Sequence, residues 1–140
     1  MNFIKLFVNH NKPGSFVNRL RKKRFALLQK EIEKMISEKG QIKMLDIGGE
    51  MGYWKHIGWQ NEHCTIYLLN LANSHTPADI PGFMHVTGNA LALPYQFGEF
   101  DLVFSNSEIE HMGSKENQVQ FAKEVKRVCD KYIIKTPSYW

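Results

Sequence analysis

Residues 44–54 read Met-Leu-Asp-Ile-Gly-Gly-Glu-Met-Gly-Tyr-Trp and carry the strongest signal in the chain. An apolar strand ends at Asp46 and is followed at once by a turn with glycines at positions 48, 49 and 52. Glycine has no Cβ, so the backbone of such a turn can adopt positive φ and approach a ligand closely. We therefore expect a ligand site at the end of this strand, with the Asp46 carboxylate beside the start of the next helix.

Two common nucleotide-binding motifs do not fit this turn. In the pattern G-x-G-x-x-G, Gly49 and Gly52 match the last two glycines, but Ile47 occupies the first position. No G-K-[S/T] sequence occurs anywhere in the chain, so a phosphate-binding loop of that type is excluded. The turn therefore favours a nucleoside without a pyrophosphate group.

Length and composition predict one domain spanning residues 1–140. A chain of 140 residues with 43% hydrophobic residues can bury a genuine core, but it is too short for two domains of ordinary size. Cys64 and Cys129 are isolated in the sequence, which argues against a disulfide framework and a zinc site. No signal peptide pattern and no apolar run of membrane-spanning length is present. We expect a cytoplasmic protein with no metal and no membrane insertion.

The N-terminal segment, residues 1–40, is strongly basic. Residues 1–30 contain eight Lys/Arg and no Asp/Glu, whereas the rest contains ten basic and fourteen acidic residues. Apolar residues recur there at spacings of three and four, which predicts an amphipathic helix from Ser15 to Glu38, with Ser15 as N-cap and Gly40 as the stop. The basic residues fit a solvated face of a helix packed on a sheet. They also fit a site for nucleic acid, acidic lipid or a phosphorylated substrate.

The remaining core, residues 41–140, alternates apolar runs with helical or irregular segments. This rhythm is typical of a parallel sheet with helices on its faces. The predicted strands are Lys43–Ile47, Thr65–Leu71, Gly82–Val86, Phe100–Ser105 and Tyr132–Lys135. The predicted helices after the first are Tyr53–Gly58 and Asn117–Cys129. The expected fold is an α/β Rossmann-like three-layer sandwich with parallel strand order 3-2-1-4-5.

Four segments follow one another in an order known from one enzyme family. They are the glycine turn after Asp46, the strand end at Asn70-Leu71, the run Gly88-Asn89-Ala90-Leu91-Ala92-Leu93-Pro94, and residues 100–107 followed by Ile109-Glu110-His111. Together they resemble the motifs of class I S-adenosylmethionine (SAM)-dependent methyltransferases, in the small-molecule, methyltransferase type 11-like branch. The resemblance covers residues 43–140.

The resemblance implies SAM as the cofactor. The residues expected to contact it are Asp46, Gly48, Gly49, Gly52, Asn70, Leu71, Asn89, Ala90, Ser105 and Asn106. Three positions depart from the family pattern: Glu50 replaces a glycine, and Asn70 and Asn89 replace the acids that face the ribose and the adenine. The two amide oxygens can still accept hydrogen bonds, without the charge assistance of a carboxylate.

The implied reaction is methyl transfer to a small-molecule oxygen, nitrogen or carbon atom. His111, which follows the polar turn Ser105-Asn106-Ser107, is the candidate general base, because its ordinary pKa lies near neutrality. Methyltransferases that modify exocyclic amines of nucleic-acid bases carry Asn/Asp-Pro-Pro-aromatic at this turn, so a nucleic-acid substrate is disfavoured. Two rivals stay open: a non-catalytic binding protein of the same fold, and a nucleic-acid-binding module that uses the basic helix.

The last predicted strand has a further consequence. The family sheet normally closes with an antiparallel β-hairpin after its fifth strand, and that hairpin is missing from this sequence, which is therefore expected to be truncated. Tyr132–Lys135 would then form an exposed sheet edge, and exposed edges favour pairing with another chain. We expect self-association through this edge.

Overall fold

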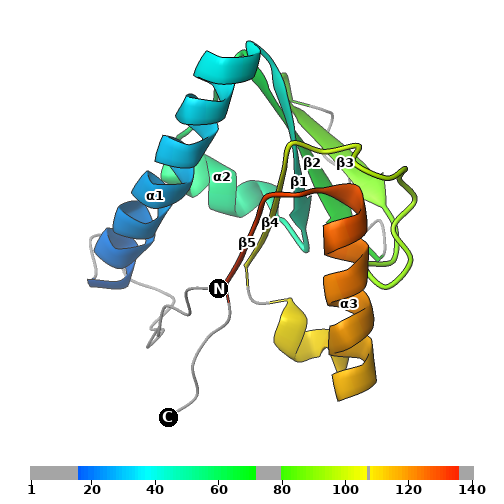
Figure 1. Ribbon diagram of the computed structural model, residues 1–140. Coiled ribbons are helices and arrows are strands. Elements are labelled where there is room, and N and C mark those ends of the chain that lie inside the picture. Colours follow the sequence, from blue (N-terminus) through cyan, green and yellow to red (C-terminus); the bar gives the residue numbers. More distant parts are fainter. Residues whose placement is uncertain (1–15, 72–79, 107, 136–140) are drawn as a thin grey trace.

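Five parallel strands form the sheet of this chain, in a computed structural model that describes residues 16–71, 80–106 and 108–135 (Figure 1). The strands are β1 (Ile42–Ile47), β2 (Cys64–Asn70), β3 (Phe83–Thr87), β4 (Leu102–Asn106) and β5 (Tyr132–Lys135). Their order is β3-β2-β1-β4-β5, and every neighbouring pair is parallel. The predicted Rossmann-like order is confirmed, and each predicted strand lies within one or two residues of its observed bounds.

Helices cover both faces of the sheet. They are α1 (Phe16–Lys39), α2 (Met51–Ile57), the 3-10 helix η1 (Ile109–Met112) and α3 (Lys115–Val128). In Figure 1, α1 and α2 lie on one face, and α3 lies on the other. The three layers predicted from the sequence are therefore present.

Alternation along β1 explains the two cores. Met44 faces the core shared with α1 and α2, whereas Leu45 and Ile47 face the core shared with α3. Because helices cover both faces, nearly every residue of this central strand is buried, as is usual in parallel sheets. Asp46 is the polar exception, and it lies on the α1 and α2 face with Met44.

Helix α1 matches its prediction at the C-terminal end. Gly40 adopts φ +83° and its N–H donates to the Ile36 carbonyl over 2.7 Å, which ends the helix as expected for a glycine stop. The predicted N-cap, Ser15, lies outside the described residues. One side chain of the basic run departs from the solvated-face interpretation: Arg24 is only 7% exposed and lies in the interface between α1 and the sheet.

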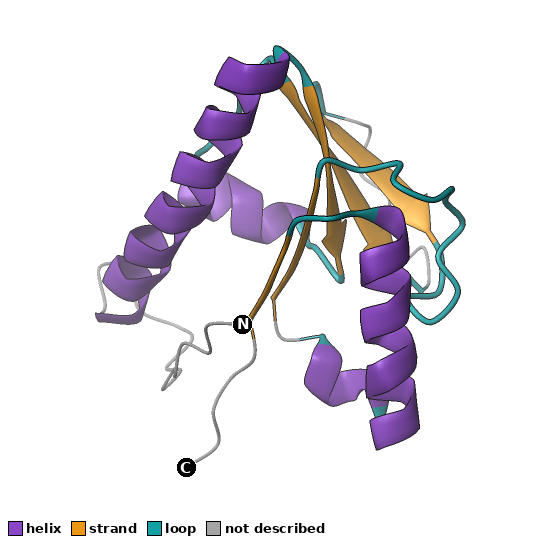
Figure 2. Ribbon diagram, viewed as in Figure 1, coloured by secondary structure: helices purple, strands orange, loops and turns teal. Residues whose placement is uncertain are grey.

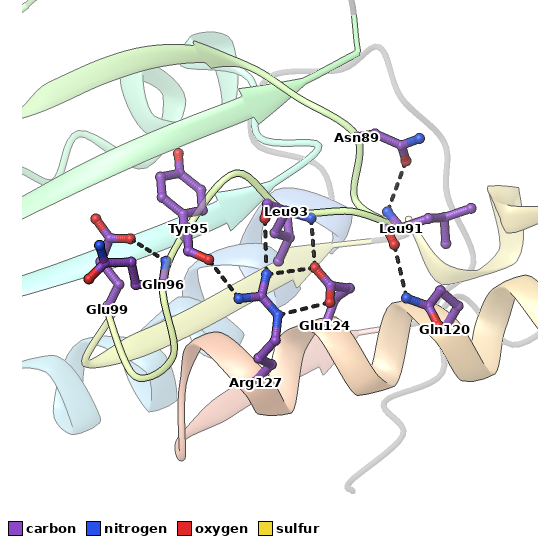
Figure 3. A network of polar contacts seen from close by, with 9 residues as sticks. All are labelled: Asn89, Leu91, Leu93, Tyr95, Gln96, Glu99, Gln120, Glu124 and Arg127. Carbon is purple, nitrogen blue, oxygen red and sulfur yellow. Dashed lines mark hydrogen bonds and ion pairs between the residues drawn. The ribbon is translucent and has the colours of Figure 1, made fainter.

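The connection from β3 to β4 contains no helix (Figure 2). A network of polar contacts fixes it to α3 instead (Figure 3). Glu124 accepts from the Leu93 N–H over 2.7 Å and pairs with Arg127 over 2.8 Å. Arg127 in turn donates to the carbonyls of Leu93 and Tyr95, over 2.9 and 2.6 Å. The segment that the sequence assigns to the adenine is therefore held in place by α3.

Strands β3 and β5 are the two edges of the described sheet. Residues 136–140, which follow β5, lie outside the described residues, so whether the β5 edge is free stays a prediction. No helix within the described ranges combines the length and the apolar character needed to cross a membrane.

Candidate functional site

The candidate site lies where the carboxyl ends of β1 and β4 meet. The chain continues from β1 to β2 on one side and reaches β4 on the other, so this is the point where the strand order reverses. Open parallel sheets bind ligands in the crevice outside the strand ends at such a point. The residues that follow β1, β2 and β4 therefore form the edge of the candidate site.

The glycine turn after β1 has two positions at which only glycine fits. Gly48 adopts φ +75°, and a Cβ added there would lie 2.2 Å from the side chain of Glu108. At Gly49 an added Cβ would lie 2.2 Å from Oδ2 of Asp46. Gly52 differs, because an added Cβ would meet nothing within 4 Å. Gly52, in the first turn of α2, is therefore the glycine with open space beside it.

Asp46 is engaged by the protein itself. It is 2% exposed, and its Oδ2 accepts a hydrogen bond from the indole Nε1 of Trp54 over 2.8 Å. Burial raises the pKa of this carboxyl to about 7, against the opposing effect of the Trp54 hydrogen bond. Asp46 thus connects β1 to α2 beneath the turn, and Trp54 packs in the core.

Asn70, at the end of β2, holds the turn from the other side. Its Nδ2 donates to the Gly49 carbonyl over 2.8 Å, and the Asn70 carbonyl accepts from the Gly88 N–H over 2.9 Å. No described residue donates to its side-chain oxygen, so that atom is available to a ligand hydroxyl. The next residue, Leu71, is 76% exposed.

Asn89 forms a local turn of its own. Its Oδ1 accepts from the Leu91 N–H over 2.9 Å, as Figure 3 shows, and its side chain is exposed. This hydrogen bond occupies the amide oxygen that the sequence assigns to an exocyclic amine. Ala90 is 8% exposed and packs in the α3-side core.

The end of β4 brings one predicted residue inward and another outward. Ser105 is fully buried, and its hydroxyl donates to the Ile47 carbonyl over 3.1 Å, which ties β4 to β1. Asn106 is exposed at the strand end. Ser107 lies outside the described residues.

Glu108 is a residue whose place the sequence did not reveal. Glu108 precedes η1 without a side-chain capping hydrogen bond, and its side chain lies against Gly48. Burial raises the pKa of its carboxyl, with His111 opposing the shift and Glu110 and Glu50 adding to it. In the sequence, only its position directly after the polar turn Ser105-Asn106-Ser107 indicated that Glu108 lies near the site.

His111 lies on η1, with 69% of its side chain exposed. Its Nε2 is 3.9 Å from Oε1 of Glu110. An exposed imidazole beside a carboxylate can exchange a proton with solvent, which suits the predicted general base.

Two further cations lie near the site: Lys135, which the sequence did not mark, and Arg24, which belongs to the basic run of the N-terminal segment. Lys135 ends β5 on the α1 face, with its Nζ 5.3 Å from the centre of the Phe104 ring. Buried Arg24 lies on α1, which covers the same face. Within the described ranges, no three His, Cys, Asp or Glu side chains gather as a metal site would require.

A family model described as a methyltransferase domain matches residues 56–132, which is more than half of the chain. The chain belongs to this methyltransferase-domain family. The match runs from α2 to the first residue of β5 and begins after the glycine turn. The assignment of the turn therefore rests on its own residues and geometry.

Solved structures similar to this methyltransferase domain show the same fold. The YcgJ protein of Bacillus subtilis has a TM-score of 0.52 and 15% identity, over 76% of this chain and 50% of that protein. A presumed SAM-dependent methyltransferase of Methanococcus maripaludis has a TM-score of 0.50 and 17% identity, over 91% and 67%. A presumed methyltransferase from an antibiotic biosynthesis pathway of Anabaena variabilis has a TM-score of 0.50 and 20% identity, over 71% of this chain and 41% of that protein.

This methyltransferase domain thus spans 41% to 67% of the length of those three proteins. No curated protein matches it in sequence.

Proposed function

We propose that this chain is a SAM-dependent methyltransferase domain acting on a small-molecule acceptor. The observation that carries the proposal is the glycine turn at the reversal point of the sheet, in a chain of the methyltransferase-domain family. The turn has open space beside Gly52 and an unbonded amide oxygen at Asn70, and both fit a nucleoside lying across the ends of β1 and β2.

The chain's own residues have distinct roles in this proposal. Gly48, Gly49 and Gly52 give the cofactor a backbone surface, and the Asn70 oxygen accepts from a ribose hydroxyl. Glu108, which lies over Gly48, supplies negative charge toward the cationic part of the cofactor. Asp46 acts indirectly, because its hydrogen bond to Trp54 fixes the start of α2.

When bound, SAM supplies a methyl group already activated on a sulfonium. The protein then needs mainly to align the acceptor with that group, so proximity and orientation carry most of the acceleration. His111 removes the proton of a hydroxyl or amine acceptor and passes it to solvent from its exposed ring.

Cofactor binding is tested by filling the open space beside Gly52. Gly52→Leu adds a side chain where an added Cβ meets nothing within 4 Å, in a helix that favours leucine over glycine by ~1 kcal/mol. The protein should therefore stay folded. We expect S-adenosylhomocysteine, measured by calorimetric titration, to bind the variant roughly tenfold or more weakly than the parent, a loss of ~1.4 kcal/mol.

Lys55→Leu is the matched control, because Lys55 is exposed one turn later on the same helix. It should bind the ligand as the parent does. If the folded parent binds no S-adenosylhomocysteine at millimolar concentration, the proposal fails and only the fold stands. Binding without turnover on any acceptor would favour the non-catalytic rival.

A further inference from the structure

Lys135 occupies a costly position for a cation. It lies partly buried at the carboxyl end of β5, in register with Asn106 of β4 and on the same face as Phe104. Within the described ranges its ammonium makes no hydrogen bond and no ion pair. The Phe104 ring, 5.3 Å away, attracts the charge weakly and cannot replace the lost water.

The surroundings of Lys135 add a second cation. Burial is the main cause that lowers the pKa of Lys135 to about 8, and the Arg24 guanidinium lowers it further, while Asp46 opposes the shift. Arg24 comes from α1 and Lys135 from β5, so two elements far apart in sequence bring like charges to one place. A partly buried lysine near an arginine is best explained by an anion that binds there.

The location indicates which ligand that anion belongs to. Most residues assigned to the cofactor follow β1, β2 and β3, and Ser105 and Asn106 end β4. Lys135 ends β5, the strand at the other edge of the sheet from β3. The methyl acceptor must approach from this other side. The Phe104 ring, which faces the Lys135 ammonium, also contacts Tyr53 and Trp54 of α2, with ring centres 6.1 and 6.2 Å apart.

We propose that Lys135, with Arg24 beside it, holds an anionic oxygen group of the methyl acceptor, either a carboxylate or a phosphate monoester. The inference rests on the proposed methyl transfer and narrows its acceptor to acidic small molecules. The bound anion restores a counter-charge to the Lys135 ammonium and positions the acceptor on the β5 side of the site.

The test titrates the full chain with benzoate, phenyl phosphate and, as the neutral analogue, benzyl alcohol. NMR signals of the Lys135 side chain, assigned by their loss in Lys135→Arg, report binding. We expect at least one of the two anions to bind saturably and to raise the pKa of Lys135, and benzyl alcohol to do neither. The anion that binds identifies the group as carboxylate or phosphate.

Lys135→Met should weaken binding of that anion roughly tenfold or more. Lys135→Arg, which keeps the charge, should retain most of it. Lys126→Met, an exposed lysine on α3 at the opposite face, should change nothing. S-adenosylhomocysteine affinity should change much less than anion affinity in these variants, because Lys135 ends the edge strand β5, and β4 lies between it and β1.

No saturable anion binding, or equal binding to Lys135→Met and Lys126→Met, overturns the inference. If Lys135→Met does not fold, two measurements still test the inference: the rise in the pKa of Lys135 when the anion binds the parent, and the anion affinity that Lys135→Arg retains. If S-adenosylhomocysteine does not bind the parent, the proposed function is wrong. The anion titration still tests, independently, whether Lys135 binds an anion.

Discussion

Several side chains assigned to the cofactor hold the site together before they meet a ligand. Asp46 bonds to Trp54, Asn70 bonds to the Gly49 carbonyl, and Ser105 bonds to the Ile47 carbonyl. Each of these contacts fixes the glycine turn between β2 and β4. A ligand would therefore meet mainly backbone and the few polar atoms that remain unbonded.

Asp46→Asn tests the cost of the buried carboxyl. Its folded pKa of about 7 lies above the ordinary value of 3.8, so the folded state holds a proton that the unfolded state loses between those pH values. The contribution of Asp46 to stability must fall as pH rises from about 4 to 7. Asparagine can still accept from Trp54 without ionising. We expect the free energy of unfolding of the variant to rise relative to that of the parent over this range, by at most ~4 kcal/mol at pH 8.

The measurement is urea unfolding of both proteins at several pH values. Asp130→Asn, at an exposed aspartate before β5, is the control and should show no such gain. A constant difference between Asp46→Asn and the parent from pH 4 to 8 would contradict the shifted pKa.

His111→Ala tests the general base. Losing a positioned base costs roughly a hundredfold or more in rate. Cofactor affinity should not change, because the imidazole is mostly exposed on η1. Single-turnover rates with any accepted substrate provide the comparison, and His56→Ala, at an exposed residue of α2, serves as control. Equal rates for both variants would return His111 to a structural role and leave catalysis to proximity.

At the scale of elements, α3 serves as the support of the loop between β3 and β4. Gln120 donates to the Leu91 carbonyl over 3.1 Å, next to the Glu124 and Arg127 contacts (Figure 3). The loop has no helix of its own, so these side chains replace the packing that a helix would supply. The position of Asn89 and Ala90 therefore depends on α3.

Arg127→Met tests this support. It leaves the nearly buried Glu124 without its cation, and we expect a loss of ~2 kcal/mol in unfolding free energy at pH 7. The hydrogen bond from Arg127 lowers the pKa of Glu124, so the pair stabilises above the unfolded pKa, near 4, and this stabilisation disappears as pH falls through the folded pKa. The difference in unfolding free energy between the parent and Arg127→Met should therefore become smaller below pH 4.

Urea unfolding at pH 7 and pH 3 measures both effects, with Lys126→Met as the exposed neighbour for comparison. A gap of equal size at both pH values would mean that lost packing of the arginine stem, and not the charge pair, causes the destabilisation.

The elements could be predicted because their signals are local. Largely apolar runs of four to seven residues marked the strands, and Gly40 marked the end of α1. The reversal in strand order was expected from the doubly wound arrangement that such alternating α/β sequences adopt. The first residue of α2 was missed by two, since the glycine turn lowers helix propensity where the helix already begins.

The side-chain contacts of the site could not be predicted in the same way. That Asn70 donates to Gly49, and that Glu108 lies over Gly48, depends on how three strand ends meet. Arg24 and Lys135 are 111 positions apart; Arg24 lies in the basic run that also fits an anion site, whereas nothing around Lys135 marks it in the sequence. Only the folded structure shows that Arg24 on α1 and Lys135 on β5 lie near each other, on the sheet face that α1 covers.

For the molecule as a whole, the β5 edge determines how copies of the chain behave together. Strand β5 pairs only with β4 within the described ranges, and an unpaired edge is a template for another strand. We expect the average mass from light scattering to rise with protein concentration. A constant monomer mass up to millimolar concentration would mean that other parts of the chain cover this edge.

Hydrogen bonds join the carboxyl ends of β1, β2 and β3, and they predict how this part of the site opens. Gly48 N–H donates to Leu69, Asn70 donates to Gly49, and Gly88 N–H donates to Asn70. Because Asn70 bonds both to the Gly49 carbonyl and to the Gly88 N–H, we expect the glycine turn and the loop after β3 to open together. The amide protons of Gly48 and Gly88 should therefore exchange with deuterium at one common rate, as a single cooperative unit.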